Sequence, residues 1–389
     1  MAAGSPQVPR ILFLHYGEAW IRGSERCLLD LLARLDRSRF DPLVACNQRP
    51  MREAVERLGI PCFETPFPEI MIDRSHVRLE LGRYLSALRA ILRFARSSPG
   101  GPPTGLYCNS GLGAQIGFGV SKVLRVPRLC HLHAPFDRRY YALWTLWDAQ
   151  EIVFVSEATR RVSLAKLRYR GRVTVVHNGV DLERFAPVKD RDPLIRARLG
   201  LPPATPVIGQ IGSLIERKGG DVLLRAFREL RARRPAKLVL VGEGPDRAKL
   251  AAQAAALGVA DDVLFTGELD DPESLLQHVF DVNVLASRSE ALPLSLLEAA
   301  ACGLPSVCSD AGGNPEAVEA GQTGFVVPVG DAGALAHRLG DLIDSAELRA
   351  AMGARARERA ERHFGVERYA AEIQERMTAL LHPRRSTSS

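Results

Sequence analysis

Short apolar runs alternate with longer amphipathic stretches along the whole chain. The apolar runs are bounded by turn residues, which is typical of buried parallel strands. In the first half of the chain they are Ile11–His15, Leu43–Cys46, Gly105–Asn109, Pro127–His133, Glu151–Ser156 and Arg172–His177. In the second half they are Val207–Gly212, Leu238–Gly242, Val263–Gly267, Val282–Ala286, Ser306–Ser309 and Phe325–Val327.

Helical patterns lie between these runs. The predicted helices are Gly23–Leu35, Val77–Ala95, Leu112–Leu124, Arg139–Trp147, Asp221–Arg233, Asp246–Leu257, Pro293–Ala301 and Gly333–Ile343. Alternation of strand and helix predicts an α/β fold, in which helices cover both faces of a parallel sheet. Because the pattern occurs twice, the sequence predicts two doubly wound, Rossmann-like domains in tandem that face a central cleft. Ligands of such sheets bind beyond the carboxyl ends of the strands, so we expect function in the loops that follow strands.

The chain length of 389 residues suits two domains. We place the first domain at residues 1–185 and the second at residues 186–365. The stretch Asp181–Pro206, rich in Pro, Asp and Arg, is the expected linker. A further helix at residues 366–382 is expected to return to the first domain, and residues 383–389 form a polar tail that we expect to be disordered.

Composition narrows the class of protein. No window holds the roughly 18 uncharged apolar residues of a membrane span, and the first residues lack the pattern of a signal peptide. The seven cysteines form no C-x-x-C pair, so we expect reduced core residues in a cytoplasmic protein. The 52 basic and 45 acidic residues give a net charge of +7, which favours anionic small ligands or an anionic membrane surface. The arginines are scattered, so nucleic acid is not the expected partner.

Two carboxylates follow the predicted strand Val282–Ala286. Glu290 lies in the loop after this strand, and Glu298 lies in the second turn of the next helix. Pro293 suits the first turn of that helix, where the free N–H groups around Leu294 suit a phosphate. Carboxylates accept hydrogen bonds from sugar and ribose hydroxyls. The alternative is a pair of solvated surface glutamates, and the position of Glu290 in a loop after a strand favours the binding site.

A basic pair follows the first strand of the second domain. Gly212 ends this strand, and Arg217 and Lys218 precede the helix Asp221–Arg233. Glycine allows a close approach of the backbone, and the two cations suit a diphosphate. A solvated basic turn is the alternative.

These motifs together resemble the group 1 family of retaining glycosyltransferases, which has two Rossmann-like domains in the GT-B architecture. The matching segments are Val176–Asp181, Gly212–Gly219, Leu240–Pro245, Phe265–Gly267 and Glu290–Ala317. The matched set is far more specific than any one motif. The resemblance implies transfer of a sugar from a nucleotide-diphosphate sugar to a glycan, lipid-linked or small-molecule acceptor, for example in polysaccharide or glycolipid biosynthesis.

The resemblance also implies roles for single residues. Arg217 and Lys218 would bind the donor diphosphate, Glu298 the ribose hydroxyls and Glu290 the hydroxyls of the transferred sugar. The nucleotide base would lie near Gly267 and Leu269, on backbone groups. Neither a cofactor nor a metal ion is expected, because the only D-x-D sequence, Asp190–Asp192, lies in the linker. The family usually has Gly where this chain has Ala291, which bears on donor preference.

In the first domain, Gly23 resembles part of the family's glycine loop, with Ser24 in place of the commoner second Gly. His133 matches the family's histidine near the transferring sugar. His131 and His133 share one face of a strand, so zinc is an alternative. We favour a core position for His131, because only Asp137 lies nearby in the sequence as a further ligand.

The predicted helix Val77–Ala95 carries an apolar stripe with arginines beside it. Such a helix packs on a core or lies on an anionic membrane, and the core is the favoured interpretation. The apolar stretch Pro66–Met71 suits acceptor binding or membrane contact. Two other functions remain open from the sequence: a nucleotide-sugar epimerase on the same architecture, and a non-catalytic protein that binds nucleotide sugars.

Overall fold

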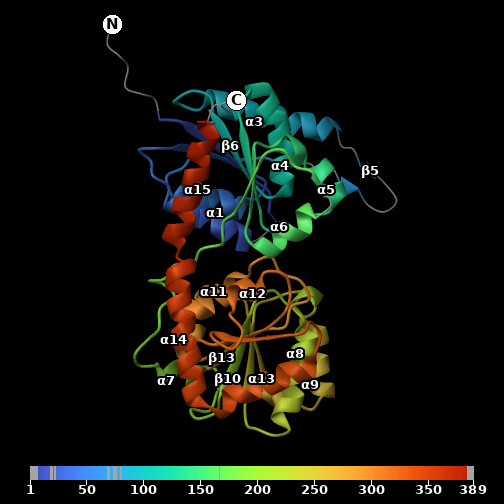
Figure 1. Cartoon of the computed structure of the whole chain (residues 1–389), viewed down its shortest axis with the longest axis vertical. Coiled ribbons are helices and arrows are strands. Elements are labelled where there is room, and N and C mark those ends of the chain that lie inside the picture. The colour runs from blue at the N-terminus through green and yellow to red at the C-terminus, as the bar shows by residue number, and fades with distance from the viewer. Residues whose placement is uncertain are drawn as a thin grey trace, which may run out of the picture. The chain divides into compact units, whose positions relative to one another are not determined.

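A computed structural model describes residues 8–17, 21, 23–67, 71–72, 77–78, 81–165 and 167–382. The chain divides into two compact units, the first made of residues 1–177 and 367–389 and the second of residues 178–366. The first division therefore lies at residue 177, where the sequence suggested residue 185. The expected polar tail at residues 383–389 and part of the apolar stretch Pro66–Met71 lie outside the described residues. Each unit contains a parallel sheet with helices packed on its faces (Figure 1).

The sheet of the first unit has seven parallel strands in the order β3-β2-β1-β6-β7-β8-β9. They are β1 (Arg10–His15), β2 (Asp41–Cys46), β3 (Cys62–Glu64), β6 (Gly105–Asn109), β7 (Arg128–Leu132), β8 (Glu151–Phe154) and β9 (Arg172–Val175). The strand order reverses between β1 and β6, where the register pairs His15 with Asn109. This reversal is the topological switch point at which open α/β sheets bind ligands.

The helices of the first unit are α1 (Gly23–Ala33), α2 (Arg49–Arg57), α3 (Leu81–Ser97), α4 (Gly111–Leu124), α5 (Arg138–Leu143), α6 (Glu157–Leu164) and α15 (Val366–Leu381). The helix predicted from Val77 is wrong at its start. Val77 and Arg78 form strand β5, which pairs antiparallel with β4 (Met71–Ile72), and the helix begins at Leu81. Backbone pairing between two strands overrides the spacing of apolar residues here.

The core of the first unit consists of the strands and the helix faces turned toward them. Ile11, Leu12, Phe13 and Leu14 of β1 are completely buried, which agrees with the buried parallel strand predicted there. On α3 the buried residues are Ala87, Ile91, Leu92 and Ala95. The favoured interpretation of this helix, with one face on a core, is therefore confirmed for its C-terminal part.

The sheet of the second unit has six parallel strands in the order β12-β11-β10-β13-β14-β15. They are β10 (Val207–Ile211), β11 (Lys237–Val241), β12 (Val263–Gly267), β13 (Val282–Leu285), β14 (Ser306–Ser309) and β15 (Gly324–Val327). The helices are α7 (Pro193–Arg198), α8 (Gly220–Arg231), α9 (Arg247–Ala256), α10 (Pro272–His278), α11 (Leu294–Ala301), α12 (Asn314–Ala317), α13 (Ala332–Asp344) and α14 (Ala346–His363). The switch point of this sheet lies between β10 and β13.

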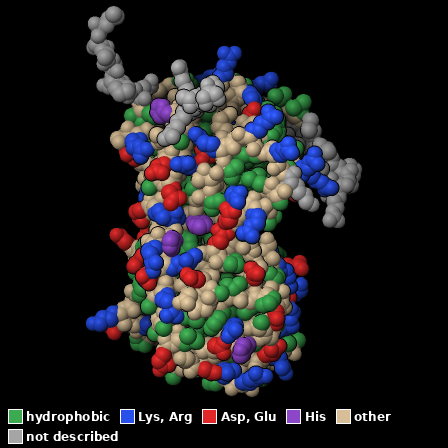
Figure 2. Space-filling model, viewed as in Figure 1, with side chains coloured by type: hydrophobic (Ala, Val, Ile, Leu, Met, Phe, Trp, Pro, Cys, Tyr) green, Lys and Arg blue, Asp and Glu red, His purple; other side chains and the backbone are tan. Residues whose placement is uncertain are grey.

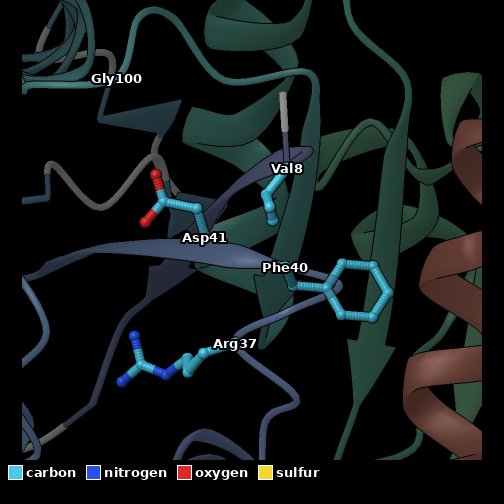
Figure 3. Close-up of a pocket in the computed structure, with 5 residues that line it drawn as sticks. All are labelled: Val8, Arg37, Phe40, Asp41 and Gly100. Atoms are coloured by element: carbon cyan, nitrogen blue, oxygen red, sulfur yellow. The ribbon is translucent and has the colours of Figure 1, made fainter. Parts of the chain in front are cut away.

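The two parallel, doubly wound sheets confirm the predicted fold class. The described residues include no helix that is long and apolar enough to cross a lipid bilayer. A pocket of about 290 Å³ lies in the first unit and is lined by Val8, Arg37, Phe40, Asp41 and Gly100 (Figure 3). Because Val8 precedes β1 and Asp41 begins β2, this pocket lies at the amino ends of the strands, away from the edge where such sheets bind ligands.

Candidate functional site

Two loops meet at the switch point of the second unit. One loop follows β10 and contains a short 3₁₀ turn at Glu216–Lys218, and the other follows β13 and leads into α11. Arg288 joins them, because its backbone N–H donates to the carbonyl of Arg217 at 2.7 Å. Its guanidinium donates two hydrogen bonds to the Asp221 carboxylate, at 2.9 and 2.8 Å. This bidentate pair holds the two loops in one arrangement.

The carboxylate of Glu290 lies where the two loops meet. Lys218 Nζ donates a hydrogen bond of 2.6 Å to Glu290 Oε1, and Arg217 lies 3.1 Å from Oε2. Ser287 Oγ also donates to Oε1, at 2.7 Å. Three residues predicted for the site, Arg217, Lys218 and Glu290, are therefore brought together, although they lie in separate parts of the sequence.

The charge of Glu290 is stabilised by its neighbours. Its side chain is only 6% exposed, and this burial by itself raises the pKa of the carboxyl. The charges of Lys218 and Arg217, with the hydrogen bonds from Lys218 and Ser287, outweigh burial and hold the pKa of Glu290 below its ordinary value. Glu290 is therefore ionised at neutral pH and accepts hydrogen bonds only.

Two glycines allow the close packing of these loops. Gly219 has φ +67°, and a Cβ there would lie 2.0 Å from the carbonyl oxygen of Ala286. Gly312 has φ +57°, and a Cβ there would lie 1.8 Å from the carbonyl oxygen of Glu290. A side chain at either position would displace the backbone that carries the ion-paired cluster.

The remaining predicted residues of the second unit lie at the carboxyl ends of its strands. Gly212 follows β10, and Gly267 ends β12 and accepts a hydrogen bond of 2.8 Å from the N–H of Gly242. Leu269 follows Gly267 and is half-buried. Leu294 begins α11, and Glu298, 7% exposed, lies in the second turn of that helix.

One detail of the prediction for α11 is wrong. Pro293 has φ −74° and ψ 127°, which is extended backbone, so it stands just before the helix as its N-cap residue and not in the first turn. The helix therefore begins at Leu294, one residue later than predicted.

Gly23 and His133, the other two predicted residues, belong to the first unit. Gly23 begins α1, and Ser24, which stands in place of the commoner second Gly, does not have a positive φ. His133 follows β7 and is half-buried, with its Nε2 2.9 Å from Asn109 Oδ1. Burial, with a smaller effect from His15, lowers the pKa of His133 to about 4, so its ring is neutral at pH 7.

Asn109 belongs to a buried polar cluster that the sequence did not identify as a site. Its Nδ2 lies 2.9 Å from His15 Nδ1, and His15 Nε2 lies 3.2 Å from Glu25 Oε1. Burial raises the pKa of the Glu25 carboxyl, but the hydrogen bonds from His15 and Ser24 lower it to about 2. A signal in the sequence that could have identified this cluster is the pair of polar residues, His15 and Asn109, at the ends of two predicted strands.

His131 is a core residue, as the favoured interpretation required. It is completely buried, and its Nδ1 lies 2.6 Å from the hydroxyl of Tyr107. Burial holds the pKa of His131 well below its ordinary value. Among the described residues, no group of three or more His, Cys, Asp or Glu side chains is arranged to hold a metal ion. The alternative of a zinc site at His131 and His133 thus gains no support from the residues around them.

Two models of protein families match the chain. The model described as "Glycosyl transferases group 1" matches residues 192–359, and "Glycosyltransferase Family 4" matches residues 21–184. The chain carries a group 1 glycosyltransferase domain and a family 4 glycosyltransferase domain.

Curated relatives share part of their length with this chain. The GDP-mannose-dependent alpha-(1-6)-phosphatidylinositol monomannoside mannosyltransferase of Mycolicibacterium smegmatis is 37% identical over 231 residues, which cover 57% of this chain and 59% of that protein. The D-inositol 3-phosphate glycosyltransferase of Streptomyces scabiei is 40% identical over 226 residues, which cover 55% of this chain and 50% of that protein. The chain thus spans little more than half the length of these relatives.

Solved structures share the fold of the whole chain. Anabaena HepE, crystallised with UDP and glucose, matches with a TM-score of 0.82 and 23% sequence identity over 95% of this chain and 99% of HepE. At this identity the likeness concerns the fold, which is the GT-B architecture of two Rossmann-like domains.

Proposed function

We propose that this protein is a retaining glycosyltransferase that moves a hexosyl group from a nucleotide-diphosphate sugar to a hydroxyl of a glycan, lipid-linked or small-molecule acceptor. The cluster of Arg217, Lys218 and Glu290 at the switch point carries the proposal. Two cations match a diphosphate, and an ionised carboxylate beside them matches the hydroxyls of the sugar attached to it.

In the proposed reaction, Arg217 and Lys218 neutralise the diphosphate as it leaves. The acceptor hydroxyl attacks the anomeric carbon on the face from which the nucleotide departs, and the departing phosphate takes the hydroxyl proton. This route needs no protein nucleophile, so the chain contributes positioning and stabilisation of charge. Glu298 would bind the ribose, and backbone groups near Gly267 and Leu269 would bind the base.

The relatives support a donor and an acceptor class. One is named for its use of GDP-mannose and a phosphatidylinositol mannoside, and another for D-inositol 3-phosphate. HepE was solved with UDP. We infer a GDP- or UDP-hexose donor and an acceptor with polyol hydroxyls, on a glycolipid or a small molecule. We further propose that the reaction requires no metal ion, because the two cations already oppose the diphosphate charge.

Peripheral contact of a cytoplasmic enzyme with an anionic membrane is a second part of the proposal. On α3, Leu81 is 54% exposed and Leu85 37% exposed, and the exposed side of the same helix carries Arg89 and Arg93. Trp147, 52% exposed, packs beside Phe118 of the neighbouring α4. Figure 2 shows basic and hydrophobic side chains close together over this part of the first unit. Such a surface suits anionic lipid headgroups.

The function is tested with purified full-length protein, a series of GDP- and UDP-hexoses, and acceptors from inositol phosphates to phosphatidylinositol. Transfer of the sugar with retained anomeric configuration is the expected result, and the matched variants Lys218→Ala and Lys249→Ala show whether the proposed site performs it. Lys249 is an exposed lysine of α9 in the same unit. Conversion of the donor sugar without an acceptor would identify an epimerase instead, and nucleotide-sugar binding without turnover would identify a non-catalytic binding protein.

A further inference from the structure

A chain of four polar side chains crosses the carboxyl ends of the central strands in the first unit. It runs from Glu25 to His15, from His15 to Asn109, and from Asn109 to His133, with contacts of 3.2, 2.9 and 2.9 Å. His15 and Asn109 are completely buried, and Glu25 is 3% exposed. Buried polar groups of this kind are held in definite hydrogen-bonding roles, because an unpaired donor or acceptor is costly away from water.

The amide of Asn109 has a defined orientation. Its Nδ2 lies 3.2 Å from the backbone carbonyl oxygen of Ser24, which can only accept a hydrogen bond. If the amide were turned over, its own oxygen would face that carbonyl, and two acceptors would repel each other. The NH₂ group therefore points toward Ser24 and His15, and Oδ1 points toward His133.

This orientation decides where the proton of His133 lies. His15 Nε2 donates to the ionised Glu25, while His15 Nδ1 lies near both Asn109 Nδ2, at 2.9 Å, and the backbone carbonyl oxygen of Asn109, at 3.2 Å. Since Asn109 Oδ1 can only accept, His133 Nε2 carries a proton. The Nδ1 of the neutral His133 ring is then a hydrogen-bond acceptor, and it makes no hydrogen bond to any residue that the structure describes.

The backbone holds Asn109 firmly in this place. The register of the parallel strands sets Asn109 beside His15 on one side and His131 on the other. The next residue, Ser110, has φ 114° and ψ 164°, a backbone conformation that residues other than glycine rarely adopt. Ser110 is fixed there because its N–H donates to the carbonyl of His131 at 3.0 Å and its hydroxyl caps α4. Strained backbone of this kind clusters at functional sites.

We propose that Asn109 is a positioning residue that fixes the tautomer of His133 and leaves Nδ1 of His133 as an acceptor for a hydroxyl group of the substrate. The contact with a substrate hydroxyl rests on the proposed glycosyl transfer. The tautomer itself rests on the hydrogen-bond chain alone.

The tautomer is measured by NMR on full-length protein labelled with ¹⁵N in its histidine rings. The signals of His133 are identified as those missing from His133→Gln. At pH 7 we expect a protonated, pyrrole-type Nε2 and an unprotonated, pyridine-type Nδ1. A protonated Nδ1, or a doubly protonated ring, would overturn the proposal, because either means that Asn109 has the other orientation or no control of the ring.

Two variants test whether Asn109 is the cause. Asn109→Leu removes the donor and the acceptor of the side-chain amide and keeps a side chain of similar size. His133 should then sample both tautomers. Tyr107→Phe removes the hydrogen bond to His131 in the same core and should leave the His133 signals unchanged. The proposal is wrong if Asn109→Leu keeps the single tautomer, or if Tyr107→Phe disturbs His133 as strongly as Asn109→Leu does.

Asn109→Asp provides the comparison if the leucine variant does not fold. A carboxylate keeps the acceptor for Nε2 of His133 and adds a negative charge beside the ring, so the pKa of His133 should rise. The other titratable groups around this ring are His15, Glu25 and His131. A titration of His133 that is unchanged from the parent protein would contradict the proposal.

Kinetic measurements distinguish a failure of this inference from a failure of the proposed function. In Asn109→Leu we expect kcat/KM for transfer to fall about tenfold, the value of one hydrogen bond, with unchanged affinity for free GDP or UDP. Full activity in this variant, with its His133 tautomer lost, would refute the positioning role. Absence of transfer from the parent protein with every donor would refute the proposed function and leave the measured tautomer standing.

Discussion

Lys218 and Glu290, 72 positions apart in the sequence, are joined by a hydrogen bond of 2.6 Å between two largely buried, oppositely charged side chains. The pair keeps a carboxylate ionised at the edge of the sheet and keeps a lysine directed to the same place. In the proposed reaction, a bound diphosphate would share Lys218 with Glu290. The pair would therefore keep both side chains in position before the donor binds.

Replacement of Lys218 by Ala should lower kcat/KM for sugar transfer on the order of 10²–10³, because one fixed cation no longer opposes the charge of the departing diphosphate. Steady-state kinetics with the preferred donor measure this. Lys249→Ala removes an exposed lysine of the same unit and should keep parental kinetics. Equal kinetics in the two variants would remove Lys218 from the proposed reaction.

Gly312→Ala should displace Glu290 and weaken binding of the donor. The new Cβ would lie 1.8 Å from the carbonyl oxygen of Glu290, at a φ of +57°. We expect a loss of about 1–3 kcal/mol in the free energy of unfolding, together with a raised KM for the donor. Gly321→Ala is the matched control, because Gly321 has φ +77° and nothing lies within 4 Å of its added Cβ. If both variants lose donor affinity equally, the contact with Glu290 is not the cause.

The lowered pKa of Glu290 predicts a dependence of stability on pH. A carboxyl whose pKa is lower in the folded state stabilises that state above its ordinary pKa, and this stabilisation is lost as the pH falls through the folded pKa. The difference in unfolding free energy between parent and Glu290→Gln should therefore be largest near pH 7 and shrink below about pH 4.3. Urea unfolding across this range measures it, with the exposed Glu229→Gln as control. A difference that grows toward acid pH would show that the charge of Glu290 destabilises the fold.

Chelation of metal ions should leave transfer unchanged. Arg217 and Lys218 supply the positive charge that a divalent cation supplies elsewhere. Initial rates before and after dialysis against EDTA are the measurement. Loss of activity that Mg²⁺ or Mn²⁺ restores would contradict the proposed reaction.

The exposed face of α3 predicts salt-sensitive binding to vesicles that contain anionic lipid. Full-length protein should sediment with phosphatidylglycerol vesicles at low salt, and less at high salt, because screening weakens the attraction of Arg89 and Arg93. Their joint replacement by Glu should abolish binding, whereas Arg228→Glu, on the exposed side of α8 in the second unit, should lower it only slightly. Vesicle binding that changes neither with salt nor with the α3 substitutions would show that another surface contacts the lipid.

All twelve strands that the apolar runs predicted are present in the structure, but the patterns did not predict three further short strands or the polar helix α2. Strand β3 has three residues, none of them fully buried, at the edge of its sheet. In helix α2 only Met51, Ala54 and Val55 are buried, and most of its other residues are charged. Such elements are stabilised by their neighbours in the fold, and their own sequence carries little periodicity.

The residues of the candidate site also differ in whether the sequence could predict them. Arg217, Lys218 and Glu290 could be predicted because each lies between a strand and the helix that follows it. The chain from Glu25 to His133 could not, because Asn109 lies 94 positions from His15 and only the register of β1 and β6 makes them neighbours. Strand order and register are long-range properties that apolar periodicity does not contain.

The C-terminal helix also bears on how the protein folds during translation. Tyr369, Ile373 and Met377 of α15 are completely buried in the first unit, whose other part ends at residue 177. The ribosome therefore makes the whole second unit before it makes the helix that closes the first. The nascent first unit keeps an uncovered apolar surface throughout that interval, so the second unit can complete its fold first, and the N-terminal half depends longest on protection from aggregation.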